Sequence, residues 1–267
     1  MKILIPMAGA GKRFSDAGYT IPKPLLPTTY LEDGKKYPMV VCAVKDVEKL
    51  RNAEEETETI FIYRSDRDNS SVADMLKKTF DNVRIIGVDY LTEGQAATCL
   101  LAKEYINNDE ALLIAGCDNG MVVNKKTFDN MSKDSDVIVF TYRHNDCVLR
   151  NPNAYGWVQV AENNIITDVS VKKALSDNPM EDHAIVASFW FKRGKDFVNC
   201  TEKMIKADDR VNDEFYIDKV IKYCLAEGLK IRAYEVERYL CWGTPNDYEK
   251  YEKTIEYWWD FICKHRL

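Results

Sequence analysis

The chain has 267 residues, of which 46% are hydrophobic and 11% aromatic, enough apolar side chains to bury a sizeable core. Its formal net charge of −6 at pH 7 argues against a chain-wide electrostatic footprint for nucleic acid or for an anionic membrane surface. The composition therefore predicts a folded protein with neither nucleic-acid nor membrane partners, in which any anion-binding site is local.

The eight cysteines are scattered, with neither a C-x-x-C pair nor a Cys/His cluster at metal-ligand spacing, so we expect free thiols in a reducing compartment. The first apolar run is broken by Pro6 and followed by Lys12 and Arg13. No later run approaches the roughly 18 apolar residues of a membrane span. We therefore expect a cytoplasmic chain with neither export signal nor membrane span.

Strand-like runs alternate with helical patterns in the first half of the chain. The runs rich in β-branched and aromatic residues are KILIPM, TIFIYR, NVRIIGVD, ALLIAGCD and DVIVFTYR. Residues 38–52 carry apolar side chains at helical spacing, namely Val40, Val44, Val47 and Leu50. Thr92, with Gln95 three residues later, has the capping-box pattern of a helix start. The alternation predicts a parallel sheet with helices on both faces.

The second half of the chain is richer in strand-like runs, which are YGWVQVAEN, NIITDVSVKK and HAIVASFWFKR, with a turn at Asn163-Asn164. Helical patterns return at residues 213–228 and 246–267. No repeat, low-complexity tract or linker divides the halves. We predict one continuous α/β domain, a core followed by a β-rich half.

The glycine-rich stretch after the first run, Gly9-Ala10-Gly11, has the composition of a phosphate-binding turn. The P-loop pattern is excluded because its first glycine would fall on Pro6 and its metal-binding hydroxyl on Arg13. A dinucleotide fingerprint is weakened because Phe14 stands where its third glycine belongs. The remaining pattern is G-x-G-x-R, with Lys23 between two prolines ten residues later.

This pattern resembles the sugar-phosphate nucleotidyltransferases of the GT-A-like fold, which make NDP-sugars and related CDP-activated compounds. The resemblance implies a Rossmann-like, mostly parallel mixed sheet flanked by helices. It also implies that the opening loop binds the nucleotide through Met7, Ala8, Gly9, Ala10, Gly11 and Lys12. Arg13 and Lys23 would face the phosphates, whose mutual repulsion with a phosphorylated acceptor requires cations. The alternative is that these are ordinary surface charges.

Two further segments match the nucleotide half of the family. Glu93, Gly94 and Gln95 are similar to its base-selecting loop, whereas the alternative is a capped helix start without a ligand. Asp118 ends a buried strand, where the family places its metal-binding Asp, so Mg²⁺ is the implied cofactor. Asp-Asn-Gly is also a turn signal, which is the alternative interpretation of Asp118.

The acceptor half is matched less closely. Tyr155-Gly156 and Lys172 fit the family's Tyr-Gly strand and its acceptor-phosphate lysine, although Val171 and Lys173 depart from the pattern and the register could slip to Lys173. The alternative interpretation is that Lys172 and Lys173 are ordinary exposed lysines at the end of a strand.

Glu214 and Asp218 have i, i+4 spacing and resemble the family's acidic helix facing the acceptor. The alternative is a solvated acidic face. In YLCWGTPNDY the family's second metal-binding Asp falls at or near Cys241, and a thiol is a poor ligand for Mg²⁺.

We therefore predict a single nucleotidyltransferase domain over residues 1–267, with a nucleotide-binding core (1–143), an acceptor-binding half (144–245) and a C-terminal helix (246–267). An acceptor phosphate oxygen would attack the α-phosphorus of an NTP, and pyrophosphate would leave. Arg13, Lys23 and Lys172 would be catalytic, and Tyr155, Gly156, Glu214 and Asp218 would bind the acceptor.

The finer assignments rest on resemblance to a branch associated with capsule and surface-polysaccharide synthesis, which favours CTP over UTP, dTTP or GTP. The acceptor alternatives are a sugar phosphate, glycerol phosphate, phosphocholine and phosphoglutamine. A GT-A glycosyltransferase and a non-catalytic nucleotide sensor remain alternatives of other classes. The aromatic residues of 248–259 indicate packing on the core or on a second copy, so a homo-oligomer also remains open.

Overall fold

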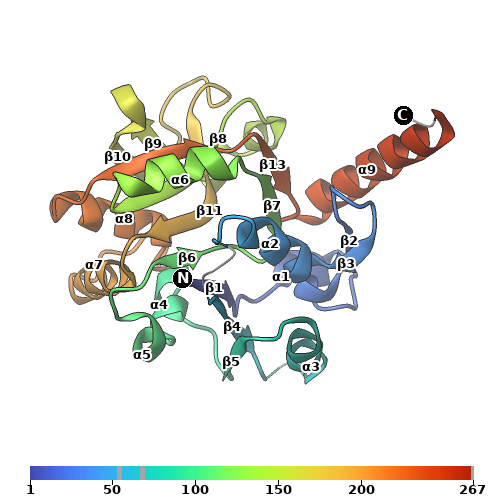
Figure 1. Cartoon of the computed structure of the whole chain (residues 1–267), viewed down its shortest axis with the longest axis horizontal. Helices are drawn as coiled ribbons and strands as arrows, with labels where there is room; N and C mark the ends of the chain where they lie inside the picture. Colours follow the sequence, from blue (N-terminus) through green and yellow to red (C-terminus); the bar gives the residue numbers. More distant parts are fainter. Residues whose placement is uncertain (53–55, 67–69, 266–267) are drawn as a thin grey trace.

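The computed structural model describes residues 1–52, 56–66 and 70–265, and residues 266–267 of the expected C-terminal helix lie outside this part. Figure 1 shows a central sheet with helices packed around it. The nine-stranded sheet runs β10-β9-β11-β6-β1-β4-β5, with β8 against β11 and β12 against β8. Its strands are β1 (Lys2–Met7), β4 (Glu58–Arg64), β5 (Val83–Val88), β6 (Leu112–Ile114), β8 (Val137–Tyr142), β9 (Gly156–Val160), β10 (Ile166–Val171), β11 (His183–Phe191) and β12 (Ile231–Glu235).

The sheet is mixed, which confirms the predicted fold class. Strands β5, β4, β1 and β6 are parallel, and β11 pairs antiparallel with β6, β8 and β9. The run DVIVFTYR therefore does not extend the first parallel block, because β11 inserts between β6 and β8. Strands from both halves of the sequence share one sheet.

Helices cover both faces of the sheet, because neighbouring side chains of each strand point to opposite faces. In β1, Leu4 packs into one buried cluster, whereas Ile3 and Ile5 pack into the other. The first cluster includes side chains of α4 (Gln95–Leu100), α5 (Lys103–Ile106), α7 (Gly194–Lys206) and α8 (Ile217–Ala226). The second cluster includes side chains of α2 (Met39–Glu48), α3 (Ser70–Thr79) and α6 (Lys125–Lys133).

Short elements complete the fold. They are the two-stranded sheets β2 (Pro27–Thr29) with β3 (Lys36–Pro38) and β7 (Asn119–Val122) with β13 (Arg238–Cys241), the helix α1 (Lys12–Asp16), and the 3₁₀ turns η1 (Lys23–Leu25), η2 (Asp146–Leu149), η3 (Pro152–Ala154) and η4 (Glu162–Asn164). The predicted turn at Asn163-Asn164 is confirmed, because both residues have positive φ angles.

Two predicted helix starts are wrong. Helix α4 begins at Gln95 with Gly94 at its N-cap, and the Thr92 hydroxyl contacts Thr98 instead of capping the helix. Helix α8 begins at Ile217, after an isolated bridge between Val211 and Glu214. Glu214 therefore precedes the helix, and the predicted shared helical face of Glu214 and Asp218 does not exist.

The C-terminal helix α9 (Pro245–His265) extends away from the body of the protein (Figure 1). Its start is a capping arrangement in which the Thr244 hydroxyl accepts the Asp247 amide at 3.2 Å and donates to the Asp247 carboxylate at 2.6 Å. Tyr248 is buried on the core, whereas Tyr257 and Trp258 are exposed. Within the described residues, none of the helices is both long enough and apolar enough to span a membrane.

Gly94 holds the loop before α4 against the segment before α8. Its φ is +121°, and a Cβ there would lie 2.5 Å from the Phe215 nitrogen and 2.6 Å from its carbonyl oxygen. The same Phe215 amide donates to the Glu93 carbonyl at 2.8 Å, and its carbonyl accepts from Ala96 at 2.9 Å. A side chain at position 94 would force these two segments apart.

We expect Gly94→Ala to lower the free energy of unfolding by at least about 3 kcal/mol, because it adds a backbone clash to an unfavourable φ. The matched control is Gly228→Ala, since Gly228 also has positive φ but its Cβ would meet no described heavy atom within 4 Å. That control should cost about 1 kcal/mol. Urea unfolding measures both, and equal losses would contradict the close approach at Gly94.

Candidate active site

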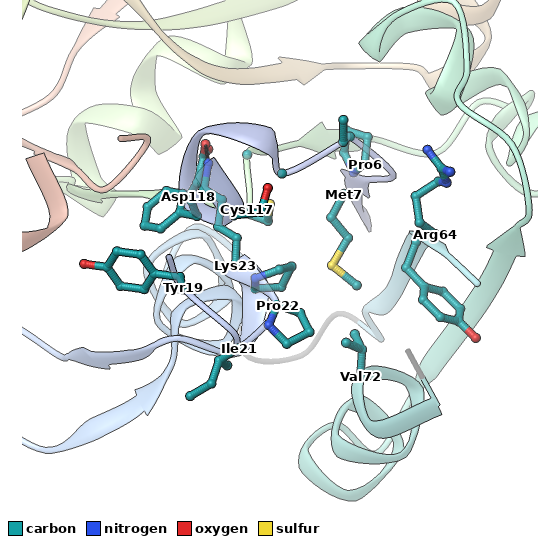
Figure 2. A pocket seen from close by; sticks show the side chains of 18 of the residues that line it. Pro6, Met7, Tyr19, Ile21, Pro22, Lys23, Arg64, Val72, Cys117 and Asp118 are labelled. Carbon is teal, nitrogen blue, oxygen red and sulfur yellow. Dashed lines mark hydrogen bonds and ion pairs between the residues drawn. The ribbon is translucent and has the colours of Figure 1, made fainter. Parts of the chain in front are cut away.

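A first cavity of about 380 Å³ lies at the carboxyl ends of β1 and β4. This is the edge where parallel α/β sheets bind ligands. Figure 2 shows Lys23, Cys117 and Asp118 on one side of it and Met7, Arg64 and Val72 on the other. Of the residues predicted to bind the nucleotide, it is lined by Met7, Gly9, Ala10, Gly11 and Gln95.

A second cavity of about 450 Å³ adjoins the first. Of the residues predicted to bind phosphate or acceptor, it is lined by Arg13, Tyr155, Gly156, Lys172 and Asp218. Both cavities share Gln95, Asp118 and Ala187. The two predicted substrate regions, far apart in sequence, therefore meet at one junction.

Ala187 shapes this junction through its backbone. It lies in β11 between Ile185 and Phe189, where the strand's pairing with β8 shifts register. Its φ is +63°, a left-handed conformation that non-glycine residues rarely adopt. Such strain is concentrated at functional sites, and here it turns the strand where the two cavities meet.

Lys23 and Asp118 form an ion pair at the junction, with the Lys23 ammonium donating to the Asp118 carboxylate. The ammonium also donates to the Gly243 carbonyl at 3.3 Å and lies 5.2 Å from the centre of the Phe14 ring. Burial disfavours the charge of Lys23, but the Asp118 carboxylate outweighs it and the pKa of Lys23 is raised. Burial likewise acts to raise the pKa of Asp118, yet Lys23 and Arg13 hold it below its usual value.

The backbone around Lys23 is stiff because prolines fix φ on both sides. Pro22 caps the 3₁₀ turn η1, which Lys23 begins and Pro24 continues. The Leu26 amide closes this turn on the Lys23 carbonyl at 3.1 Å. The short turn thus holds the lysine against Asp118, 95 residues away in the chain.

Some residues of the opening loop line the cavities, and others do not. Gly11 has a φ of +62° and precedes α1, which carries Arg13 toward the second cavity. Lys12 instead forms an exposed ion pair with Asp16 at 3.0 Å, and Ala8 is buried. Neither Lys12 nor Ala8 is among the residues that line the two cavities.

Lys172 lies in the second cavity in a left-handed conformation, with φ of +55°. Its amide donates to the Tyr155 carbonyl at 3.0 Å, and its ammonium donates to the Ala154 carbonyl and lies 4.9 Å from the Tyr216 ring centre. Burial lowers the pKa of Lys172, although Asp218 opposes the shift. Lys173, the other register considered, is exposed.

Asp218 projects into the second cavity from the first turn of α8 and lies against Gly156. A Cβ at residue 156 would collide with the Asp218 carboxylate, so glycine is required there for this packing. Burial raises the pKa of Asp218 to about 6, with Lys172 opposing. This cavity therefore contains a carboxyl that stays protonated to a higher pH than an exposed aspartate does.

Besides Lys12 and Ala8, three predicted site residues lie outside the linings of both cavities. Glu93 is exposed and pairs with Arg210 at 3.1 Å, and Gly94 packs on Phe215. Glu214 is exposed, although the negative charge of its carboxylate opposes the lowering of the Lys172 pKa by burial.

Several cavity residues were missed by the sequence interpretation. Tyr63, Arg64 and Val72 line the first cavity, and the end of the second strand-like run was the available signal for two of them. Arg150 and Asp247 line the second cavity and form an ion pair at 3.1 Å. Asp247 belongs to the Gly-Thr-Pro-x-Asp segment, whereas no local pattern marks Arg150.

The side chains near Asp118 determine whether this site could bind magnesium. Among residues 1–52, 56–66 and 70–265, no group of three His, Cys, Asp or Glu side chains could hold a metal ion. A hydrogen bond to Cys147 and burial raise the pKa of the Cys241 thiol, which keeps this soft ligand neutral. Magnesium commonly uses one or two carboxylates together with substrate phosphates and water, so Asp118 fits an ion shared with a nucleotide.

No protein-family model matches this chain, and no curated protein matches it by sequence. Solved structures do match. The nucleoside-diphosphate-sugar pyrophosphorylase of Vibrio cholerae RC9 has a TM-score of 0.75 at 20% identity, covering 94% of this chain and 99% of that chain. A UDP-glucose pyrophosphorylase complexed with UDP-glucose has a TM-score of 0.69 at 18% identity, covering 95% and 97%.

The inositol-1-phosphate CTP transferase of T. maritima has a TM-score of 0.65 at 15% identity, covering 94% of this chain and 93% of that chain. At these identities the likeness shows the fold alone. The chain thus has the α/β fold of nucleotidyltransferase structures over nearly its whole length.

We expect Asp218→Asn to stabilise the protein at neutral pH. A carboxyl whose pKa folding raises from 3.8 to about 6 makes the native state lose stability as pH rises through that window. Asparagine removes this loss. The free energy of unfolding of the variant should therefore equal that of wild type near pH 4 and exceed it by about 1–2 kcal/mol at about pH 7.5, after allowing for solvent screening. Urea unfolding across pH measures the gain.

Asp109→Asn is a control of opposite sign. The hydrogen bond from Lys195 lowers the pKa of Asp109, so removing that carboxylate should cost stability at neutral pH and not at acidic pH. Parallel pH profiles for Asp218→Asn and wild type would contradict the raised pKa of Asp218.

Proposed function

We propose that the protein is a nucleotidylyltransferase that transfers NMP from an NTP to a phosphorylated small molecule and releases pyrophosphate. The observation that carries the proposal is the meeting of two cavities at Asp118, with Lys23, Arg13 and Lys172 around the junction. The first cavity would hold the nucleotide, and the second would hold the anionic acceptor. The solved structures of the same fold are named for this class of reaction.

The reaction needs little covalent chemistry from the protein. An acceptor phosphate oxygen forms a bond to the α-phosphorus of the NTP, and the bond from that phosphorus to the bridging oxygen of the β-phosphate breaks. The nucleophile is already an anion, so it requires no base, and the electron pair leaves with pyrophosphate. Positioning and charge neutralisation would supply the catalysis.

Each cation has a place in this scheme. Lys23 would meet the reacting phosphates from the first cavity, where its proline-flanked turn restricts its backbone. Lys172 would meet the acceptor phosphate in the second cavity. Arg13 also lines the second cavity and acts electrostatically on Asp118 at the junction, from where it would hold the phosphates that leave. Bound magnesium on Asp118 would neutralise phosphate charge.

The remaining residues would set substrate choice. Gln95 at the start of α4 lines both cavities and would contact both substrates, while Met7 and the glycine loop would face the nucleotide. Tyr155, Gly156 and Asp218 would line the acceptor's other end. Ala8, Lys12, Glu93, Gly94 and Glu214 would support these contacts from outside the cavity linings.

For the substrates we propose CTP and a phosphorylated alcohol, amine, amino-acid amide or sugar. The product would be a CDP-activated precursor for capsule or surface polysaccharide, made in the cytoplasm where NTPs are available. The support is the sequence resemblance set out above together with the inositol-1-phosphate CTP transferase among the matching structures.

A matrix of CTP, UTP, dTTP, GTP and ATP against sugar 1-phosphates, glycerol 3-phosphate, inositol 1-phosphate, phosphocholine and phosphoglutamine tests this proposal. We expect magnesium-dependent pyrophosphate release with CTP and one acceptor class. Release with another NTP would replace the base assignment. Sugar transfer from an NDP-sugar without pyrophosphate release would indicate a glycosyltransferase, and NTP binding without any turnover a sensor.

We expect Arg13→Ala and Lys23→Ala each to lower kcat/KM by about 10²–10⁴-fold, because each removes a cation from the developing phosphate charge. Lys133→Ala is the control, since this exposed lysine on α6 contacts Asn130 at 3.4 Å and lines neither cavity. Near-normal rates in either site variant would withdraw that residue's catalytic role.

A further inference from the structure

The Lys23–Asp118 pair lies where both substrates would meet and is partly shielded from water. The Lys23 side chain is 17% exposed and that of Asp118 33%. Besides Asp118, the ammonium contacts the Gly243 carbonyl and the face of Phe14. The lysine therefore occupies a built binding place for a cation, formed by segments from three parts of the chain.

This arrangement conflicts with a metal ion on the same carboxylate. A divalent cation bound to Asp118 would lie within a few ångströms of the Lys23 ammonium, where like charges repel strongly in partly buried surroundings. Arg13 adds further positive charge, since it acts electrostatically on both Lys23 and Asp118. The metal can bind well only if Lys23 leaves the carboxylate or gains another anion.

A nucleotide would provide that anion. Lys23 lines the first cavity, so the phosphates of a bound NTP would offer its ammonium new oxygen partners. Asp118 would then be released to the metal that the same phosphates carry. A single carboxylate is a weak magnesium ligand by itself, and its pairing with Lys23 weakens it further.

We propose that Lys23 is the resident counter-cation of Asp118 and keeps divalent metal out of the site until a nucleotide's phosphates take over the lysine. Metal and nucleotide therefore bind together. The nucleotide-dependent step rests on the proposed function, whereas exclusion of metal from the free protein does not.

Binding of Mn²⁺ to the nucleotide-free protein tests the exclusion, with the EPR signal of free Mn²⁺ as the readout. Lys23→Met removes the ammonium and keeps an unbranched side chain, so Mn²⁺ should bind this variant about tenfold more tightly than wild type. Asp118→Asn in the Lys23→Met background should abolish the gain. Lys133→Met, a control at the exposed lysine of α6, should bind Mn²⁺ as wild type does.

Two more variants keep the test decisive. Lys23→Gln should behave as Lys23→Met does, and it carries the test if the methionine variant fails to fold. Lys23→Arg keeps the positive charge and should bind Mn²⁺ as weakly as wild type. Equal Mn²⁺ affinity in wild type and both neutral variants would overturn the inference.

The inference and the proposed function fail separately. A tenfold gain in the neutral variants, combined with no pyrophosphate release by wild type, would uphold the exclusion and refute the transferase. Pyrophosphate release by wild type with no gain in the neutral variants would uphold the transferase and refute the exclusion.

Discussion

Strand β11 sets the geometry on which both cavities depend. One end of it, Phe189–Phe191, pairs with β6, whereas His183 and Ala184 at the other end pair with β9. Because β6 leads to Asp118 and β9 begins at Gly156, main-chain hydrogen bonds fix the two halves of the chain side by side. The distance between the two cavities is therefore a property of the sheet, and a hinge is not needed to bring them together.

The chain is acidic overall, yet its cavities present cations, and three of these cations already have partners. Lys23 is paired with Asp118, Arg150 with Asp247, and the Lys172 ammonium with the Ala154 carbonyl. Buried charges left without partners would be costly. A polyanion that bound to these three cations would therefore exchange partners with the protein, and its affinity would depend on how well its oxygens replace those of the protein.

The α/β class followed from the alternation of strand and helix patterns, whereas the mixed sheet was implied by the family resemblance. The first strand, Lys2–Met7, was predicted to the residue, and the bounds of the next strands differ by one or more residues. The insertion of β11 between β6 and β8 could not be predicted, because long-range pairing leaves no local pattern. The family resemblance singled out Asp118 and Lys172 as site residues, and the structure brings both into the lining of one cavity. No sequence pattern indicated that Lys23 pairs with Asp118. Arg150 was missed because only the folded chain brings it to the second cavity.

Several residues with left-handed backbone conformations lie in the cavity linings or next to a lining residue. Gly94, Lys172 and Ala187 all have positive φ, and each is fixed by contacts distant in sequence: Gly94 by Phe215, Lys172 by Tyr155 and Ala187 by the neighbouring strands. Strained conformations persist only where surrounding structure determines them fully. The packed sheet thus supports an irregular cavity lining, and that irregularity holds the lysine of the second cavity in place before any ligand arrives.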